Sequence, residues 1–205
     1  MSTTKNDVLV WDLPTRIGHW LLAGGFALAW ITGESEEWRL IHVLAGGTVV
    51  GVVLFRLLWG LIGTRYALFA DFVWNPSAAW AYLKSLLGPK PEHHIGHNPA
   101  GGLAIVLLLV LALATSAAGW LNYQEIGGKL TEAFHEGLAN AMLAVVLVHL
   151  AGVLVGSIKH HENLPRTMVT GMKRGYANDA IAGARPFAAI ALIVWVAAVA
   201  WLLSR

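Results

Sequence analysis

Five long runs of apolar residues constrain this chain more than any other feature of its sequence. They cover approximately residues 17–33, 40–62, 101–121, 136–158 and 187–203. A helix needs about 20 predominantly apolar residues to cross the hydrocarbon core of a bilayer, so the first and last runs are close to the lower limit. Only 13% of the 205 residues are charged, against about 25% in an average soluble protein. We therefore expect an all-α integral membrane protein with five transmembrane helices.

Basic residues are unevenly distributed over the segments that connect these runs. If the N-terminus is cytoplasmic, only Arg39, Lys129 and Arg205 of the 14 lysines and arginines fall on the outer side. Positive charge is retained on the cytoplasmic side of membranes, so we expect a cytoplasmic N-terminus in the bacterial inner membrane. The outer segments carry glutamates, namely Glu34, Glu36, Glu37, Glu125, Glu132 and Glu136. The polar N-terminus is too long for a signal peptide, and nothing in the sequence points to nucleic acid.

Four histidines lie within or at the edge of the apolar runs: His19, His42, His135 and His149. An imidazole in an apolar membrane segment is costly, so we expect these residues to have a function. His135 and His149 are 14 residues apart in the segment FHEGLANAMLAVVLVHLAG. At about 100° and 1.5 Å per residue, this spacing returns to nearly the same helix face roughly 21 Å further along the axis. One helix can therefore present a ligand near each membrane surface.

The expected topology sorts these histidines into two pairs by depth. His42 and His135 fall near the outer surface, whereas His19 and His149 fall nearer the inner one. Two histidines can take both axial positions of a haem iron, so the sequence predicts two bis-histidine sites that carry electrons. A zinc site would need three or four ligands at one depth, and a hydrogen-bonded structural role is the alternative for any single histidine. The absence of cysteine excludes covalent attachment, so any haem must be held non-covalently, by histidine or methionine.

Arginines and glycines near the histidines are compatible with the same cofactor. Arg16 and Arg39 each precede a histidine by three residues, one turn closer to water on the same face. Arg56 follows His42 by 14 residues and could serve the inner haem. Guanidinium groups suit carboxylates such as haem propionates, and anchoring at the membrane interface is the alternative. The nearby glycines either admit a porphyrin or allow close helix packing; they are Gly46, Gly47, Gly51, Gly152 and Gly156.

Several motifs, in order along the chain, resemble the bacterial cytochrome b561 family. They are RIGHW, IHVLAGG, FRLLWGLIGTRYALFADF, GHNPAGG and the segment that carries His135 and His149, followed by His160 and His161. Within that family, the sequence is most similar to the hydrogenase-type cytochrome b subunits. The resemblance covers about residues 8–175 and implies a four-helix transmembrane bundle holding two b-type haems. Residues 176–205 are expected to form a linker and a fifth, C-terminal transmembrane helix.

The resemblance also implies a function and a set of ligands. The family's axial ligands match His19, His42, His135 and His149. Its members pass electrons between the membrane quinone pool and a partner on the outer face, which implies a periplasmic c-type cytochrome or a hydrogenase-like redox protein as partner. One branch instead oxidises superoxide, and superoxide:quinone oxidoreductase is the alternative function. The acidic outer loops repel an anion and suit a basic partner, which favours the electron-transfer subunit. A metal-ion carrier would need polar residues converging at mid-membrane, and apart from histidines the apolar runs offer almost none.

Residues 63–99 connect the second and third apolar runs and carry further candidates. NPSAAWAYLKSLLG predicts a short interfacial helix that starts at Asn75-Pro76, and Asn98-Pro99 is a second helix-start signal. The HHxxH pattern of His93, His94 and His97 indicates either a metal site or solvated side chains, and a quinone head group near His97 is a further hypothesis. Beyond the fourth run, His160 and His161 either help to protonate quinone or are polar interface residues.

Overall fold

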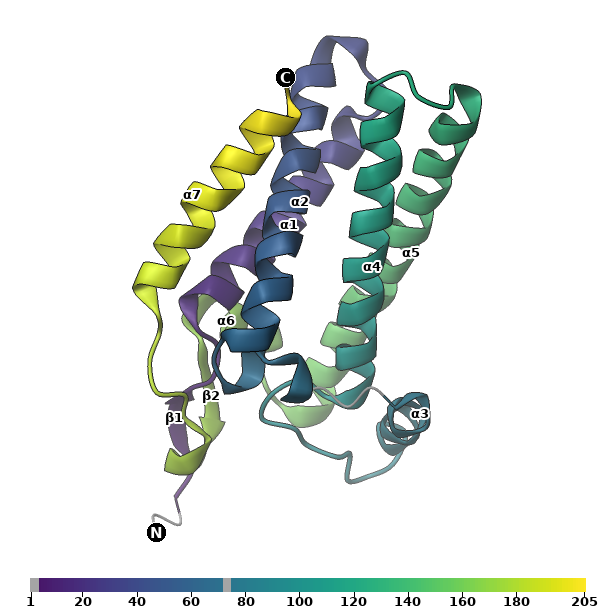
Figure 1. Cartoon of the computed structure of the whole chain (residues 1–205). Coiled ribbons are helices and arrows are strands. Elements are labelled where there is room, and N and C mark those ends of the chain that lie inside the picture. Colours follow the sequence, from purple (N-terminus) through teal and green to yellow (C-terminus); the bar gives the residue numbers. More distant parts are fainter. Residues whose placement is uncertain (1–3, 72–74) are drawn as a thin grey trace.

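The computed structural model describes residues 4–71 and 75–205 and is mostly helical (Figure 1). The long helices are α1 (Leu13–Thr32), α2 (Arg39–Ile62), α4 (Pro99–Tyr123), α5 (Lys129–His160) and α7 (Pro186–Leu203). The shorter elements are β1 (Asn6–Leu9), α3 (Pro76–Ser85), α6 (Leu164–Thr170) and β2 (Met172–Gly175). Phe72, the last residue of the FRLLWGLIGTRYALFADF motif, lies outside the described residues.

The long helices run side by side as two helical hairpins with α7 on one flank (Figure 1). α1 packs against α2, α4 packs against α5, and α2 joins the two hairpins through contacts with α4. α7 lies against α2 and α1. A Cβ atom on Gly47 would lie 2.7 Å from the Cα of Ala200, and one on Gly51 would lie 3.0 Å from the Cα of Val196. Gly47 and Gly51 therefore serve close helix packing, one of the two roles that the sequence allowed.

The helices have the length and the surface of membrane spans. Glu36–Ile62, α4, α5 and α7 are long and apolar enough to cross a bilayer. α1 has 20 residues and packs along the length of α2, although α1 is less apolar. Large apolar side chains such as Val148 and Leu154 on α5 are 70% and 63% exposed, which is the surface that lipid covers. The prediction of a multi-pass membrane bundle with a fifth, C-terminal helix is confirmed.

Capping residues fix where several helices begin. Asn75 accepts a hydrogen bond from the Ser77 amide at the start of α3, and Asn98 accepts one from the Gly101 amide at the start of α4. Both helix starts were predicted. Asp12, which sequence reasoning did not single out, caps α1 and is fully buried. Its second carboxylate oxygen accepts hydrogen bonds from Trp59 and Thr64, so one side chain ties α1 to the end of α2.

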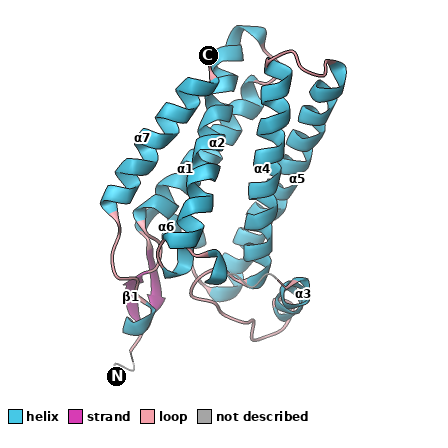
Figure 2. Cartoon of the chain, viewed as in Figure 1, coloured by secondary structure: helices cyan, strands magenta, loops and turns pink. Residues whose placement is uncertain are grey.

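A short β-ribbon accompanies the helical bundle. β1 pairs with β2 in antiparallel register, from Asn6 opposite Gly175 to Leu9 opposite Met172. Two strands of four residues, so far apart in sequence, leave no periodic pattern that could be recognised in advance. The ribbon, α3 and α6 lie at the same end of the bundle (Figure 2). We call this end the ribbon end and the opposite end, where the chain finishes, the C-terminal end.

Candidate haem-binding sites

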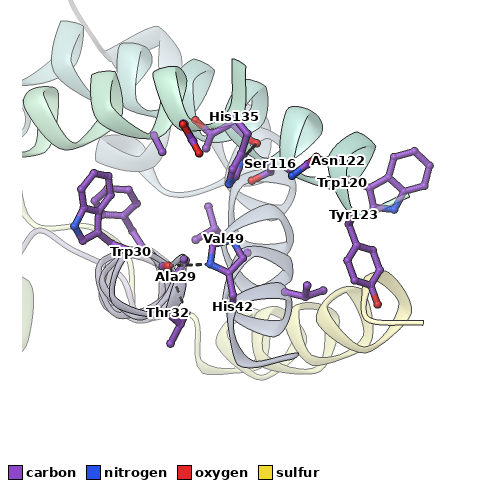
Figure 3. A pocket seen from close by; sticks show the side chains of 18 of the residues that line it. Ala29, Trp30, Thr32, His42, Val49, Ser116, Trp120, Asn122, Tyr123 and His135 are labelled. Carbon is purple, nitrogen blue, oxygen red and sulfur yellow. Dashed lines mark hydrogen bonds between the residues drawn. The ribbon is translucent and has the colours of Figure 1, made fainter. Parts of the chain in front are cut away.

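A cavity opens among the four helices of the two hairpins at the C-terminal end. Its volume is about 960 Å³, within the usual range of cofactor pockets. α2 contributes His42 to its lining and α5 contributes His135, while α1 and α4 close the remaining sides. Figure 3 shows both imidazoles projecting into the cavity from different helices. Two of the four predicted histidines therefore meet in one space of suitable size.

The two imidazoles have nearly the separation that a shared iron requires. The ring centroids of His42 and His135 are 5.9 Å apart, and the ring planes are inclined by 80°. A metal–imidazole bond is about 2.0–2.1 Å long and the ring centre lies about 1.2 Å further out, so two rings on opposite sides of one iron have centroids about 6.5 Å apart. Binding of an iron between the two rings would therefore need them to separate by only about half an ångström.

Hydrogen bonds to the backbone fix the protonation of both rings. The Nδ1 atom of His42 lies 2.8 Å from the carbonyl oxygen of Ala29 in α1, drawn as a dashed line in Figure 3. The Nδ1 atom of His135 lies 2.9 Å from the carbonyl oxygen of Thr115 in α4. A carbonyl oxygen can only accept, so Nδ1 donates in each ring and Nε2 keeps its lone pair. This is the usual arrangement of histidines that bind a metal through Nε2.

Two glycines shape the cavity in different ways. A Cβ atom on Gly119 of α4 would lie 2.7 Å from Cε1 of His135, so only glycine admits the ring in its present position. Gly46 of α2 also lines the cavity, and no atom lies within 4 Å of the position its Cβ would take. Gly46 therefore leaves space for a cofactor, whereas its neighbour Gly47 packs against α7.

Charged residues at this cavity are mostly acidic. Arg39 lies in the lining, with its guanidinium carbon 5.2 Å from the centre of the Tyr123 ring. Arg39 is the one lysine or arginine among the described lining residues. The acidic lining residues are Glu34, Glu36, Glu132 and Glu136. The electrostatic environment of this histidine pair is therefore negative apart from one arginine.

The second histidine pair lies closer to the ribbon end. His19 is in the second turn of α1 and His149 is in α5, 14 residues after His135. Both side chains are half-buried, and the two imidazoles interact electrostatically. Within the described residues, neither ring forms a hydrogen bond. The structure thus places His19 near His149 and His42 next to His135, the pairs expected by depth. Their role as haem ligands stays a prediction.

His97 and Arg56 lie beside the ribbon-end pair. The His97 ring packs on Trp11 with 4.7 Å between centroids, and its Nδ1 atom is fully buried. Desolvation, followed by the nearby charges of Arg56 and Lys173 and the His149 imidazole, lowers the pKa of His97 to about 3. His97 is therefore neutral at pH 7. The guanidinium of Arg56 lies 4.8 Å from the centre of the Phe69 ring.

Comparison with known proteins identifies the family. The family model described as "Prokaryotic cytochrome b561" matches residues 10–171 of this chain. The chain belongs to the prokaryotic cytochrome b561 family. The expected resemblance to this family of membrane cytochromes is confirmed.

Similar b561-type proteins carry hydrogenase names. A "Probable Ni/Fe-hydrogenase 1 B-type cytochrome subunit" of Escherichia coli (strain K12) is 29% identical over an alignment that covers 57% of this chain and 60% of that protein. A "Probable Ni/Fe-hydrogenase B-type cytochrome subunit" of Rhodobacter capsulatus is 20% identical over 86% of this chain and 85% of the relative. The chain thus spans about three fifths of the Escherichia coli protein. No solved structure matches the chain.

The remaining candidates of this b561 protein take other positions. A guanidinium nitrogen of Arg16 donates to the carbonyl oxygen of Val169, which ties α1 to α6. Among the described residues, no group of three or more histidine, aspartate or glutamate side chains could hold a metal ion. His93 of the HHxxH pattern instead pairs with Glu162. Glu162 and Lys173 were missed because nothing local in their sequence marks them.

Proposed function

We propose that this b561 protein carries electrons through two haem b groups between a redox partner at the C-terminal end and quinone at the ribbon end. His42 and His135 would hold one haem, and His19 and His149 the other. The observation that carries the proposal is the His42–His135 pair. Its rings are 5.9 Å apart, both Nδ1 atoms are bound to carbonyl oxygens, and both rings line one large cavity.

When bound, each haem would supply a one-electron carrier whose two axial positions are taken by imidazole, which suits electron transfer and disfavours oxygen binding. The hydrogen bonds to Ala29 and Thr115 orient the two rings and make their Nε2 atoms more basic. α5 contributes one ligand to each pair, about 21 Å apart along its axis. Between these levels, Val53 and Met142 belong to an apolar cluster that excludes water from the path.

The charge distribution supports an orientation with the ribbon end in the cytoplasm. Lys84 in α3 and Lys173 and Arg174 in β2 lie at that end, whereas the glutamates of the cavity lining lie at the other. Because positive charge is retained inside, this distribution favours a cytoplasmic N-terminus in the bacterial inner membrane. The C-terminal end then faces the periplasm, as a periplasmic partner requires.

The partner proposed first is a hydrogenase-like enzyme, because the similar proteins are named as hydrogenase cytochrome subunits. A periplasmic c-type cytochrome is the alternative partner. Four glutamates and one arginine line the cavity at the C-terminal end, so a basic docking surface is favoured. The same charges repel superoxide, which ranks superoxide:quinone oxidoreductase second.

The test uses the full chain purified in detergent. We expect two haem b per chain, with the absorbance of six-coordinate bis-histidine haem, and oxidation of the reduced protein by a short-chain quinone. Absence of haem, or reduced haem that quinone leaves unchanged, would contradict the proposal. Rapid superoxide consumption without a partner protein would reverse the order of the two functions.

A further inference from the structure

A cluster of titratable side chains lies at the ribbon end, apart from both histidine pairs. Its members come from α3, from the loop before α4, from the end of α5 and from β2. They are Tyr82, His93, His94, His160, Glu162 and Lys173. We call this group the Glu162 cluster. The electron-transfer path proposed above uses none of these side chains.

Glu162 is at the centre of the cluster. Its Oε1 atom lies 2.8 Å from Nε2 of His93, and its Oε2 atom lies 3.3 Å from Nζ of Lys173. The side chain of Glu162 is 17% exposed and that of Lys173 is 5% exposed. Burial alone would raise the pKa of Glu162, but the hydrogen bond with His93 and the charge of Lys173 outweigh burial and lower it. The carboxylate is therefore ionised and accepts the hydrogen bond that His93 donates.

The cluster connects water with the interior. His93 is 32% exposed on its side chain and can exchange protons with the aqueous phase. Its ring centroid lies 5.4 Å from that of His160. The Nε2 atom of His160 lies 3.3 Å from the hydroxyl of Tyr82. Tyr82 as a whole is only 3% exposed. Groups that can hold a proton thus follow one another from the surface inward.

The same groups lie on the side of the ribbon-end histidine pair. His160 follows His149 by 11 residues in α5, which returns to nearly the same helix face about 17 Å further along the axis. His97 interacts electrostatically with both Lys173 and His149. The Glu162 cluster is therefore next to the end of the bundle where quinone is proposed to react.

We propose that the Glu162 cluster takes up the protons that quinone reduction consumes, with the imidazole of His93 as the proton carrier and Glu162 as its positioning residue. This inference rests on the proposed function. Quinone takes two electrons from the outer redox partner and two protons to form quinol. Each proton passes from the imidazole of His93 by way of the neighbouring His160 toward quinone, and water at the ribbon end then reprotonates His93. In quinol oxidation the same path releases two protons.

The charged groups around His93 agree with this role. Glu162 and His160 face His93 from the end of α5, and Lys173 reaches Glu162 from β2. Lys173 also donates to the carbonyl oxygen of His94, at 3.1 Å. Glu92 lies 3.8 Å from the His94 ring and is the group closest to open water. Glu162 fixes the His93 ring through their hydrogen bond, and Lys173 helps to keep the carboxylate of Glu162 ionised.

The experiment compares two oxidants on the full-length protein with both haems in nanodiscs. A short-chain quinone needs protons to be reduced, whereas ferricyanide does not. Glu162→Gln and His93→Asn are compared with wild type and with Glu162→Asp, which keeps a carboxylate. Asp7→Asn is the matched control, because Asp7 is exposed, lies at the same end and is outside the cluster. Haem oxidation is followed by absorbance and proton uptake by a pH-indicator dye.

We expect Glu162→Gln and His93→Asn to slow oxidation by quinone and the accompanying proton uptake by about tenfold or more at pH 8, and less at pH 6, where protons are more available. Haem content and oxidation by ferricyanide stay at the wild-type level, and Glu162→Asp retains most of the quinone rate. The potential of the ribbon-end haem falls with rising pH in wild type, and this slope flattens in both variants.

Wild-type quinone oxidation and proton uptake in Glu162→Gln and His93→Asn would overturn the inference and leave the proposed function intact. An equal loss of ferricyanide oxidation or of haem would also overturn it, because the cluster would then be structural. If wild-type protein is oxidised by ferricyanide and not by quinone, the proposed function itself fails.

Discussion

The two histidine pairs use opposite ends of the same helix, α5, but they differ in what surrounds them. At the C-terminal end, backbone carbonyl oxygens orient both His42 and His135, and the cavity lining carries four glutamates and one arginine. At the ribbon end, His19 and His149 form no ring hydrogen bonds within the described residues. Arg56 lies at this end, and the buried carboxylate of Asp12 interacts with its charge. One pair is oriented by hydrogen bonds and faces a cavity lined mainly by glutamates, whereas the other has no ring hydrogen bond and lies at the end of the bundle that carries Arg56.

This difference gives the electron path a direction. Reduction adds one negative charge, so a positive environment raises the reduction potential and a negative environment lowers it. Carbonyl acceptors on His42 and His135 make both imidazoles more basic, which stabilises the oxidised iron further. We therefore expect the haem at the C-terminal end to have the lower potential. In the proposed function, electrons would then run from the outer partner toward the ribbon end and quinone.

Removing one ligand from each pair gives the largest expected effect. We expect His42→Ala and His149→Ala each to lose one haem and keep the other, because an iron left with one protein ligand is held far less tightly. Haem per chain, measured by pyridine haemochrome and protein assay, falls from about two to about one in each variant. Both haems retained in both variants would mean that these histidines are not ligands.

A change of one methyl group tests how tightly the C-terminal-end pair is fixed. Gly119→Ala would place a Cβ atom 2.7 Å from Cε1 of His135, so the ring must move and its bond to Thr115 is disturbed. We expect loss or altered absorbance of that haem alone. Gly137→Ala is the matched control, since nothing lies within 4 Å of its Cβ position. Equal haem spectra for the two variants would show that the ring is not held as described.

The potentials of the two haems test the electrostatic contrast. Replacing Arg56 by methionine removes a positive charge near the ribbon-end pair, and we expect the potential of that haem to fall by on the order of 50 mV. The other haem should change much less. Redox titration followed by absorbance measures both values. Arg65→Met is the control, because Arg65 is exposed and solvent screens its charge. A ribbon-end haem with the lower potential in wild type would reverse the inferred direction.

The smallest expected effect is a pH dependence of the free energy of unfolding that arises from His97 at the ribbon end. The pKa of His97 is about 3 in the folded protein, against about 6.5 for an unperturbed histidine. Between pH 3 and pH 6.5 the unfolded chain therefore binds more protons at this position than the folded protein does. The contribution of His97 to the free energy of unfolding is complete above pH 6.5 and decreases as the pH falls. The loss is at most about 1.4 kcal/mol per pH unit. Thermal unfolding at pH 7 and pH 5 should show a smaller decrease for His97→Gln than for wild type; parallel decreases would exclude His97 as the cause.

Much of the fold could be predicted because it depends on local patterns. Apolar length and helical period gave the membrane helices, and asparagine followed by proline marked the starts of α3 and α4. The helical period, combined with the expected membrane topology, predicted that His42 pairs with His135 and that His19 pairs with His149. These features depend on residues that are close in sequence or on the thickness of a bilayer, and both can be read without a structure.

The details that give each site its character could not be predicted. The carbonyl oxygen that binds His135 belongs to Thr115, and any residue at that position would offer one. His93 and Glu162 are 69 residues apart, and no periodic pattern relates them. The ribbon joins the first residues of the chain to residues beyond α6. Such contacts depend on how separate segments meet.

The sequence by itself determined that this chain crosses a membrane, that it belongs with b-type cytochromes and which four histidines are the candidate ligands. Hydropathy, helical period and side-chain chemistry are properties of each residue and its near neighbours. Only the tertiary structure decided that Gly47 packs against α7 while Gly46 faces a cavity. It also decided that backbone carbonyl oxygens bind only one of the two histidine pairs among the described residues and that Glu162 meets His93 and Lys173. Those outcomes depend on distances of a few ångströms between segments far apart in the chain, and packing alone sets them.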